Sequence, residues 1–149
     1  MSLNLDQFRD LIERTLLREC PAWLSGSAVE LLLGTCAVES DFGEFRRQVG
    51  GGPARGIFQM EPETFYWIRN YCRKDAPILD GRDVVDIETD DELAIVAARA
   101  RYRVAPVRLP TAGNTEAQAL YWKFVYNTIS GKGRVQKYLE KYNHYVIGG

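Results

Sequence analysis

The stretch "LLLGTCAVESDFGEF", residues 31–45, runs eight almost unbroken small or apolar residues into a carboxylate, Glu39. Ser27 and Glu30 stand just before the run with the spacing of a capping box, in which each side chain bonds the backbone N–H of the other residue. We therefore expect a helix that begins near Ala28 and carries the apolar run up to Glu39.

The glutamate at the end of this run has an unusual setting for a charged side chain. Leu32, Cys36 and Glu39 recur at intervals of four and three, so they share the helix stripe that faces the core. Burial and the negative end of the helix dipole both disfavour an ionised carboxyl, and we expect them to raise the pKa of Glu39. A carboxyl that stays protonated near neutral pH can act as a general acid. The alternative is that Glu39 is simply the last solvated residue of its helix.

Length and composition fit one globular domain over residues 1–149. The apolar fraction, 46%, is ordinary for a folded protein. The formal net charge of −1 gives no general reason to expect nucleic acid or an anionic membrane as a partner. We expect the protein to be a monomer. Basic residues gather near the end of the chain, where their spacing suits a solvated helix face or, alternatively, a surface for an anionic polymer: Lys132, Arg134, Lys137 and Lys141.

Cysteine usage and the N-terminus bear on the cellular compartment. Cys20, Cys36 and Cys72 lie far apart without metal-binding spacing, so we expect reduced, partly buried thiols. The N-terminal "MSLNLDQFRDLIERTLL" carries charges where a signal peptide has its apolar core, and no stretch reaches transmembrane length. We expect a soluble chain that reaches any site outside the cytoplasm without a cleaved signal, unless a leader is absent from this sequence.

Hydrophobic periodicity predicts an all-α domain of six or seven helices and almost no strand. Leu5, Phe8, Ile12 and Leu16 mark an amphipathic first helix that Pro21 ends. The other expected elements are a Gly-rich loop over residues 40–55, a helix opened by Pro62, helices capped by Thr89 with Glu92 and by Thr115 with Gln118, and a last helix over residues 134–145.

Two short motifs accompany these helices. "GIFQMEPETF", residues 56–65, places a Gly, two bulky apolar residues and a Gln ahead of a Pro-started helix. "VYNTISGKGRV", residues 125–135, ends a helix with Tyr-Asn and crosses a Gly-containing turn. Each is weak alone, because the first pattern recurs by chance and the second is an ordinary helix end and turn.

In their order along the chain, however, the motifs resemble those of soluble lytic transglycosylases. The likeness extends to goose-type lysozymes and covers about residues 28–142. It implies a lysozyme-like fold, peptidoglycan as the substrate, and cleavage of the β-1,4 bond between N-acetylmuramic acid and N-acetylglucosamine. The matching segments are "AVES" at 37–40, "GIFQMEPETF" at 56–65, "ARARYR" at 98–103, and "YN" at 126–127 followed by "GKGRV".

Carried over residue by residue, the resemblance makes Glu39 the general acid and base. It implies that Ser40 helps to orient the acid, and it places Tyr126 and Asn127 near the acid and the acetamido group of the sugar. The loop after Ser40 and the long turn after Asn127 depart from the family pattern. The segment expected to line the cleft consists of five consecutive residues, Gly56, Ile57, Phe58, Gln59 and Met60.

The reaction itself can end in two ways. Glycosidic cleavage needs a proton on a poorly basic leaving oxygen, and an inverting hydrolase needs a second carboxylate to activate water. No nearby carboxylate takes the position that the resemblance requires, so we expect Glu39 to act alone and to give 1,6-anhydromuropeptides. Hydrolysis by a lysozyme-type enzyme is the alternative, and the nearby carboxylates are Asp41, Glu44, Glu61 and Glu63.

Other chemistries have less support. His144 is the single histidine, and no signature supports a Cys/His or Ser/His hydrolase built on it. No cluster has metal-ligand spacing and no phosphate loop follows a strand, so we expect no metal and no cofactor. Sugar stacking and ordinary core packing are the two roles open to five aromatic residues, Tyr66, Trp67, Tyr121, Trp122 and Tyr126.

The alternative from another class is a noncatalytic module that keeps a lysozyme-like fold to bind glycan or to assemble with phage or secretion-apparatus proteins. The joint presence of Glu39, Gln59, Tyr126 and Asn127 favours an active site. We expect the protein to act on the bacterial cell wall, either as a virion-associated enzyme or after delivery by a secretion apparatus.

Overall fold

The structure, a computed structural model, describes residues 1–127 and 133–149, and this part of the chain contains six α-helices and five shorter helical segments joined by loops. The α-helices are α1 (Leu5–Glu19), α2 (Gly26–Ser40), α3 (Pro62–Cys72), α4 (Asp91–Arg103), α5 (Thr115–Tyr121) and α6 (Val135–Tyr142). The shorter segments are the 3-10 turns η1 (Pro21–Trp23), η2 (Pro77–Leu79) and η3 (Val84–Glu88), and the π-helical turns η4 (Trp122–Asn127) and η5 (Asn143–Ile147). The domain is all-α, as the sequence predicts.

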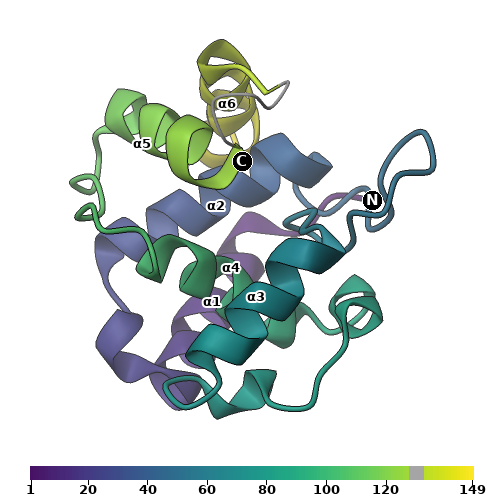
Figure 1. The fold of residues 1–149 in the computed structure, drawn as a ribbon. Coiled ribbons are helices and arrows are strands. Elements are labelled where there is room, and N and C mark those ends of the chain that lie inside the picture. The colour runs from purple at the N-terminus through teal and green to yellow at the C-terminus, as the bar shows by residue number, and fades with distance from the viewer. Residues whose placement is uncertain (128–132) are drawn as a thin grey trace.

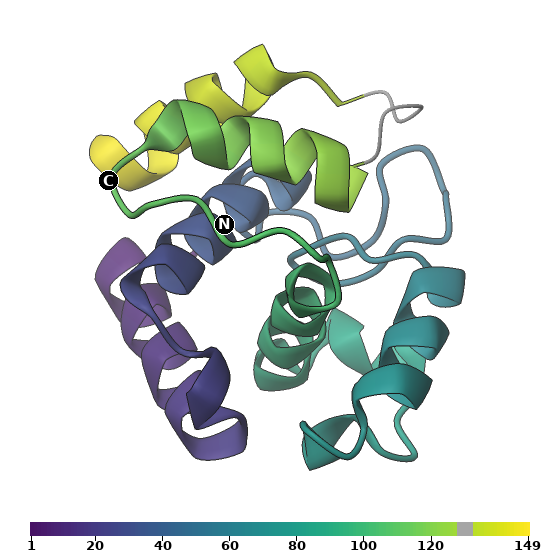
Figure 2. The same cartoon turned by 60° about the vertical axis from the view of Figure 1, so that its left-hand side comes forward.

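Helix α2 forms the centre of the molecule. Figure 1 shows it crossing the middle, with α5 and α6 on one side and α1, α3 and α4 on the other. The view in Figure 2 shows α5 and α6 lying together over α2. Residues 31–38 are all buried, so the predicted single stripe toward the core is wrong. A helix that is apolar on every side is covered on nearly every side.

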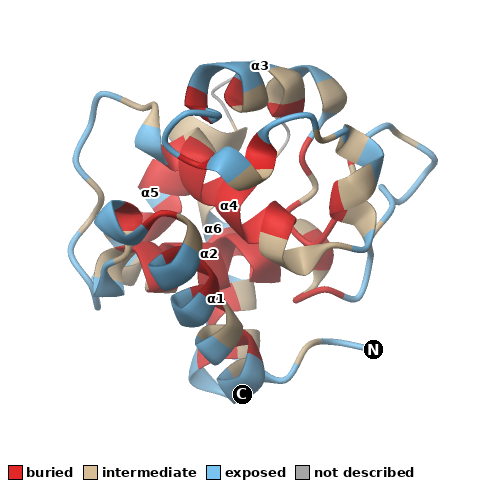
Figure 3. Ribbon diagram, turned by 90° about the horizontal axis from the view of Figure 1, so that it is seen from below, coloured by how far each residue is buried: buried red, intermediate tan, exposed pale blue. Residues whose placement is uncertain are grey.

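The core extends from α2 into the surrounding helices. Helix α4 is buried from Leu93 to Ala100, and Figure 3 shows α2 and α4 mostly buried while the outer side of α3 is exposed. The predicted inward faces of α1 and α3 are confirmed, and their buried residues include Phe8, Ile12 and Leu16 of α1 and Phe65, Ile68 and Cys72 of α3.

Three predicted helix caps are wrong by one or two residues. The predicted caps are Ser27, Thr89 and Thr115. Ser27 and Thr115 lie inside the first helical turn, and Asp and Asn cap helices more strongly than Thr does. The observed caps accept a hydrogen bond from the backbone N–H three residues later, and they are Ser25, Asp90 and Asn114.

The capping box expected for α2 is therefore absent, and Glu30 has another role. Its carboxylate accepts hydrogen bonds from the backbone N–H of Gly113 at 2.7 Å and from Gln118 Nε2 at 3.2 Å. These bonds tie the first turn of α2 to the start of α5 rather than to its own backbone.

The Gly-rich segment between α2 and α3 is the long loop that the sequence predicts. It leaves α2 through three consecutive residues with positive φ, Asp41 (50°), Phe42 (57°) and Gly43 (84°). An isolated antiparallel bridge then pairs Arg47 with Arg55 and folds the loop onto itself. The loop thus returns to the end of α2 instead of extending away from it.

The C-terminal third contains two features that the sequence does not indicate. Helices α5 and α6 each pass into a π-helical turn, η4 and η5 respectively. Such wide turns are rare in proteins, and those that occur are often found at functional sites. Residues 128–132 of the predicted long turn, Lys132 among them, lie outside the described residues. No helix in the two described ranges is long and apolar enough to span a membrane. All three cysteines are free and buried.

Candidate active site

A cleft of about 910 Å³ opens at the C-terminal end of α2. Its walls come from distant parts of the sequence, with the loop after α2 on one side and η4 and the start of α6 on the other. The charged residues that line it are Glu39, Asp41, Glu61, Arg134 and Lys137.

Glu39 is partly exposed within this cleft. Its Oε2 atom accepts a hydrogen bond from Trp122 Nε1 at 3.0 Å. Burial, the dominant influence, raises the pKa of Glu39 from 4.5 to about 7, although the Trp122 hydrogen bond and the charge of Lys137 oppose the rise. A large fraction of the carboxyl is therefore protonated at neutral pH, which is the condition that a general acid needs.

The end of α2 delivers Glu39 to the cleft. The helix stops one residue later because Asp41 adopts a left-handed conformation, which ends helices and which Asp tolerates better than most residues do. The backbone N–H of Asp41 bonds the carbonyl of Cys36 and closes the last turn. Val38, the residue before Glu39, is buried but already lines the cleft, so the helix leaves the core at this point.

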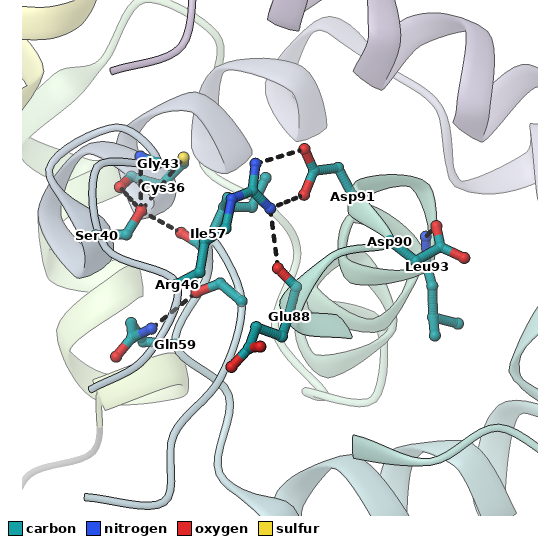
Figure 4. A network of polar contacts seen from close by, with 11 residues as sticks. Cys36, Ser40, Gly43, Arg46, Ile57, Gln59, Glu88, Asp90, Asp91 and Leu93 are labelled. Atoms are coloured by element: carbon teal, nitrogen blue, oxygen red, sulfur yellow. Dashed lines mark hydrogen bonds and ion pairs between the residues drawn. The ribbon is translucent and has the colours of Figure 1, made fainter. Parts of the chain in front are cut away.

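Ser40 fixes the loop rather than the acid. Its buried hydroxyl donates to the carbonyl of Ile57 at 2.6 Å and accepts from the backbone N–H of Gly43 at 2.8 Å, as Figure 4 shows. The resemblance implies that Ser40 helps to orient Glu39; its hydrogen bonds among the described residues are made with Cys36, Ile57 and Gly43. Ser40 holds the returning loop against the end of α2 and so supports the floor of the cleft.

The segment from Gly56 to Met60 contributes one side chain to the cleft, that of Gln59. Gly56 has a φ of +81°, and a Cβ at this position would lie 2.6 Å from the carbonyl oxygen of Ile87. Gln59 Nε2 donates to the carbonyl of Gly56 at 2.9 Å, which positions the amide at the cleft. The three apolar residues of the segment are buried beneath it, and they are Ile57, Phe58 and Met60.

Tyr126 joins the predicted motifs to one another. Its hydroxyl donates to the carbonyl of Phe58 at 2.7 Å, and its ring lies 5.4 Å from the ring of Tyr102 in the "ARARYR" segment. Ser40 already connects "AVES" to Ile57. Direct contacts therefore join all four segments, although they are spread over most of the chain.

Asn127 lines the cleft opposite the loop. Its Oδ1 atom accepts hydrogen bonds from the backbone N–H of Gly133 at 3.1 Å and from Lys123 Nζ at 2.9 Å. The bond from Gly133 holds the end of η4 to the chain that leads into α6, and the bond from Lys123 lies within η4. Since Oδ1 is engaged, the amide NH2 of Asn127 is the group that can donate to a ligand.

Two of the four carboxylates considered as a second catalytic group line the cleft. Asp41 lines the cleft and forms an ion pair with Lys141, with 2.6 Å between Asp41 Oδ1 and Lys141 Nζ. Glu61 lines the cleft with an exposed side chain. Glu44 forms an ion pair with the N-terminal amine, and Glu63 is exposed outside the cleft. Asp41 and Glu61 are therefore the candidates that the geometry retains.

Arginine side chains fasten the loop wall to the start of α4. Arg46 binds Asp91 through both terminal guanidinium nitrogens and also donates to the carbonyl of Glu88 at 3.0 Å (Figure 4). Arg47 donates to the Glu88 carboxylate at 2.7 Å, and Arg55 lies 3.6 Å from it. A glycine-rich segment thus gains a defined position from charge pairing.

The sequence does not indicate that Trp122 and Lys137 lie close enough to Glu39 to act on it. The sequence predicts for Trp122 only sugar stacking or core packing, as for four other aromatic residues, but its indole N–H donates a hydrogen bond to Glu39. Its position four residues before Tyr126, on the same helix face, could have indicated that the two act together. The sequence predicts Lys137 on a solvated helix face or, alternatively, on a surface for an anionic polymer; Lys137 is exposed, and it also lines the cleft beside Glu39. The aromatic residues of α3 lie away from the cleft, with Trp67 exposed.

Within residues 1–127 and 133–149, no group of three or more His, Cys, Asp or Glu side chains could hold a metal ion. Comparison of the chain with protein-family models, with curated proteins and with solved structures gives no match.

Proposed function

We propose that this protein is a lytic transglycosylase that cleaves the β-1,4 bond between N-acetylmuramic acid and N-acetylglucosamine in peptidoglycan, with Glu39 as general acid and then base. The observation that carries the proposal is a carboxyl with a pKa of about 7 at the end of a buried helix, open to a cleft. The cleft volume, about 910 Å³, lies near the upper end of the range for ligand pockets and suits an oligosaccharide.

The proposed reaction has two steps. Glu39 first gives its proton to the glycosidic oxygen while the bond from that oxygen to C1 of N-acetylmuramic acid breaks, and the substrate's own acetamido oxygen bonds to C1. The C6 hydroxyl of the same sugar then attacks C1, displaces the acetamido oxygen and returns its proton to Glu39. No water is consumed, so the product is a 1,6-anhydro sugar.

The surroundings of Glu39 serve both of its roles. Burial favours the protonated form that starts the reaction, and the N–H of Trp122 stabilises the carboxylate that exists between the two steps. The amide groups of Gln59 and Asn127 line the same cleft and can hydrogen-bond the acetamido group. A group that must give and then take back a proton works best when neither form is strongly favoured.

Hydrolysis is the second candidate, because Asp41 and Glu61 line the same cleft and either could activate water. Mass spectrometry of the released muropeptides separates the two. We expect 1,6-anhydro products, one water lighter than hydrolysis products, from the wild type and from Asp41→Asn and Glu61→Gln. Reducing-end N-acetylmuramic acid alone, with activity lost in one of these variants, would assign a hydrolase.

The test of the acid is Glu39→Gln, assayed by clearing of purified peptidoglycan. Gln has nearly the same shape but cannot donate the proton, so activity should fall by about 100-fold or more. Glu63→Gln, the same change at an exposed glutamate outside the cleft, is the matched control and should remain active. Retention of more than about a tenth of the wild-type rate by Glu39→Gln would remove Glu39 from the mechanism. Binding without cleavage by the wild type would point to a noncatalytic module.

A further inference from the structure

The α6 wall of the cleft carries a row of cations. Arg134, Lys137 and Lys141 recur at intervals of three and four, so they share one face of the helix and its N-cap. Arg134 and Lys137 line the cleft directly, and Lys141 pairs with Asp41, which also lines it. This wall therefore presents positive charge to the cleft.

The charges of two of these cations, Arg134 and Lys137, are not neutralised by an ion pair among the described residues. Arg134 and Lys137 are exposed, and in the part of the chain that the structure describes their side chains form no hydrogen bond or ion pair. The charge of Lys137 reaches Glu39, but that carboxyl is mostly protonated below its pKa of about 7 and then offers no compensating charge. Uncompensated cations in a concave site attract an anionic group of a ligand.

We infer that Arg134 and Lys137 bind a carboxylate carried by the muramic acid unit whose bond is cleaved. The inference rests on the proposed function. Muramic acid bears a lactyl ether that either ends in a free carboxylate or continues into a stem peptide with carboxylates of its own, whereas N-acetylglucosamine is neutral. Both sources offer the same chemistry, because ammonium and guanidinium groups bind carboxylates through charge-assisted hydrogen bonds.

The location of the two cations suits this role. The lactyl group belongs to the same ring as the C1 atom at which the bond breaks, so a carboxylate site has to lie within about one sugar unit of the catalytic acid. Lys137 shares the cleft with Glu39 and is near enough to act on its ionisation. The cleft would thus distinguish peptidoglycan from a neutral polymer of N-acetylglucosamine by charge.

Calorimetric binding to inactive Glu39→Gln protein tests the inference with three tetrasaccharide probes. The first is a peptidoglycan fragment with stem peptides, the second is the same fragment after an amidase has removed the peptides, and the third is neutral chitotetraose. Arg134→Gln and Lys137→Gln, each added to this background, should weaken binding of an acidic probe about threefold to tenfold and leave chitotetraose binding unchanged. Lys74→Gln removes an exposed cation that does not line the cleft and should change nothing.

The outcomes separate the two carboxylate sources and the two proposals. Weaker binding of the peptide-free probe alone assigns the lactyl carboxylate, and weaker binding of the peptide-bearing probe alone assigns the stem peptide. Weaker binding of both acidic probes shows that the site accepts a carboxylate from either source. Equal losses with chitotetraose, or no loss with any probe, overturn the inference. If the wild type cleaves no glycan while charge-dependent binding persists, the proposed activity fails and the carboxylate site stands. If cleavage occurs and charge has no effect, the carboxylate site alone fails.

Discussion

Replacing Glu39 by Gln should stabilise the protein by an amount that grows with pH. The pKa of Glu39 is about 7 in the folded protein and 4.5 where the group is unperturbed, as in the unfolded chain. Between these values the folded state holds more protons than the unfolded state, so the free energy of unfolding falls as pH rises from 4.5 to about 7. At about 1.4 kcal/mol per pH unit, ionisation costs the folded state about 3 kcal/mol by pH 8.

Gln keeps the shape and can still accept the Trp122 hydrogen bond, but it never ionises. We therefore expect the stability of Glu39→Gln relative to wild type to increase by about 3 kcal/mol between pH 4 and pH 8. For a chain of this length the increase corresponds to about 6 to 12 °C in the midpoint of thermal unfolding. Urea unfolding at pH 4, 6 and 8 measures it, with Glu63→Gln as the control for loss of an exposed carboxylate. A stability difference that stays constant over this range would refute the reasoning that burial governs Glu39.

Two further substitutions test the surroundings of the acid. Lys137→Gln removes a positive charge that favours the ionised form of Glu39, so the pKa of Glu39 should rise. The alkaline limb of the pH profile of kcat/KM should then move to higher pH. A limb that does not move would show that Lys137 has no effect on the ionisation of Glu39. Gly56→Ala should lower the free energy of unfolding in urea by about 2 to 4 kcal/mol, since φ is +81° and the Cβ would meet the Ile87 carbonyl. Gly81→Ala, at a φ of +71° in open space, should cost only about 1 kcal/mol, and equal costs would contradict a role for that contact.

The helices could be predicted where the apolar spacing is long and regular. The run up to Val38 determines α2, and the spacing of Phe8, Ile12 and Leu16 determines α1, because burial of such a face outweighs the preferences of single residues. Helix starts were less predictable. Neighbouring side chains compete to cap the same helix, and the packing of the whole helix decides which one lies outside the first turn.

The site was predictable in its local part and, through the resemblance of the motifs, in two further cleft residues, Gln59 and Asn127. The position of Glu39 at the end of an apolar helix, and its raised pKa, follow from the adjacent sequence. Its partner Trp122 is 83 residues away, and the contact depends on how η4 lies against α2. The same holds for Lys137, since a helical pattern shows which residues share a face but not which cleft that face meets.

The loop that forms one wall of the cleft contains potential cleavage sites for a trypsin-like protease, which cleaves after basic residues. Arg46, Arg47 and Arg55 lie in an irregular segment, yet Asp91 holds the first and Glu88 holds the other two. The hydrogen bond from Arg47 keeps the pKa of Glu88 below its usual range, so this restraint persists into mildly acidic solution. Protonation of Glu88 in stronger acid would break the ion pairs of Arg47 and Arg55 and would make this wall of the cleft more open to cleavage while the helix that carries Glu39 stayed packed.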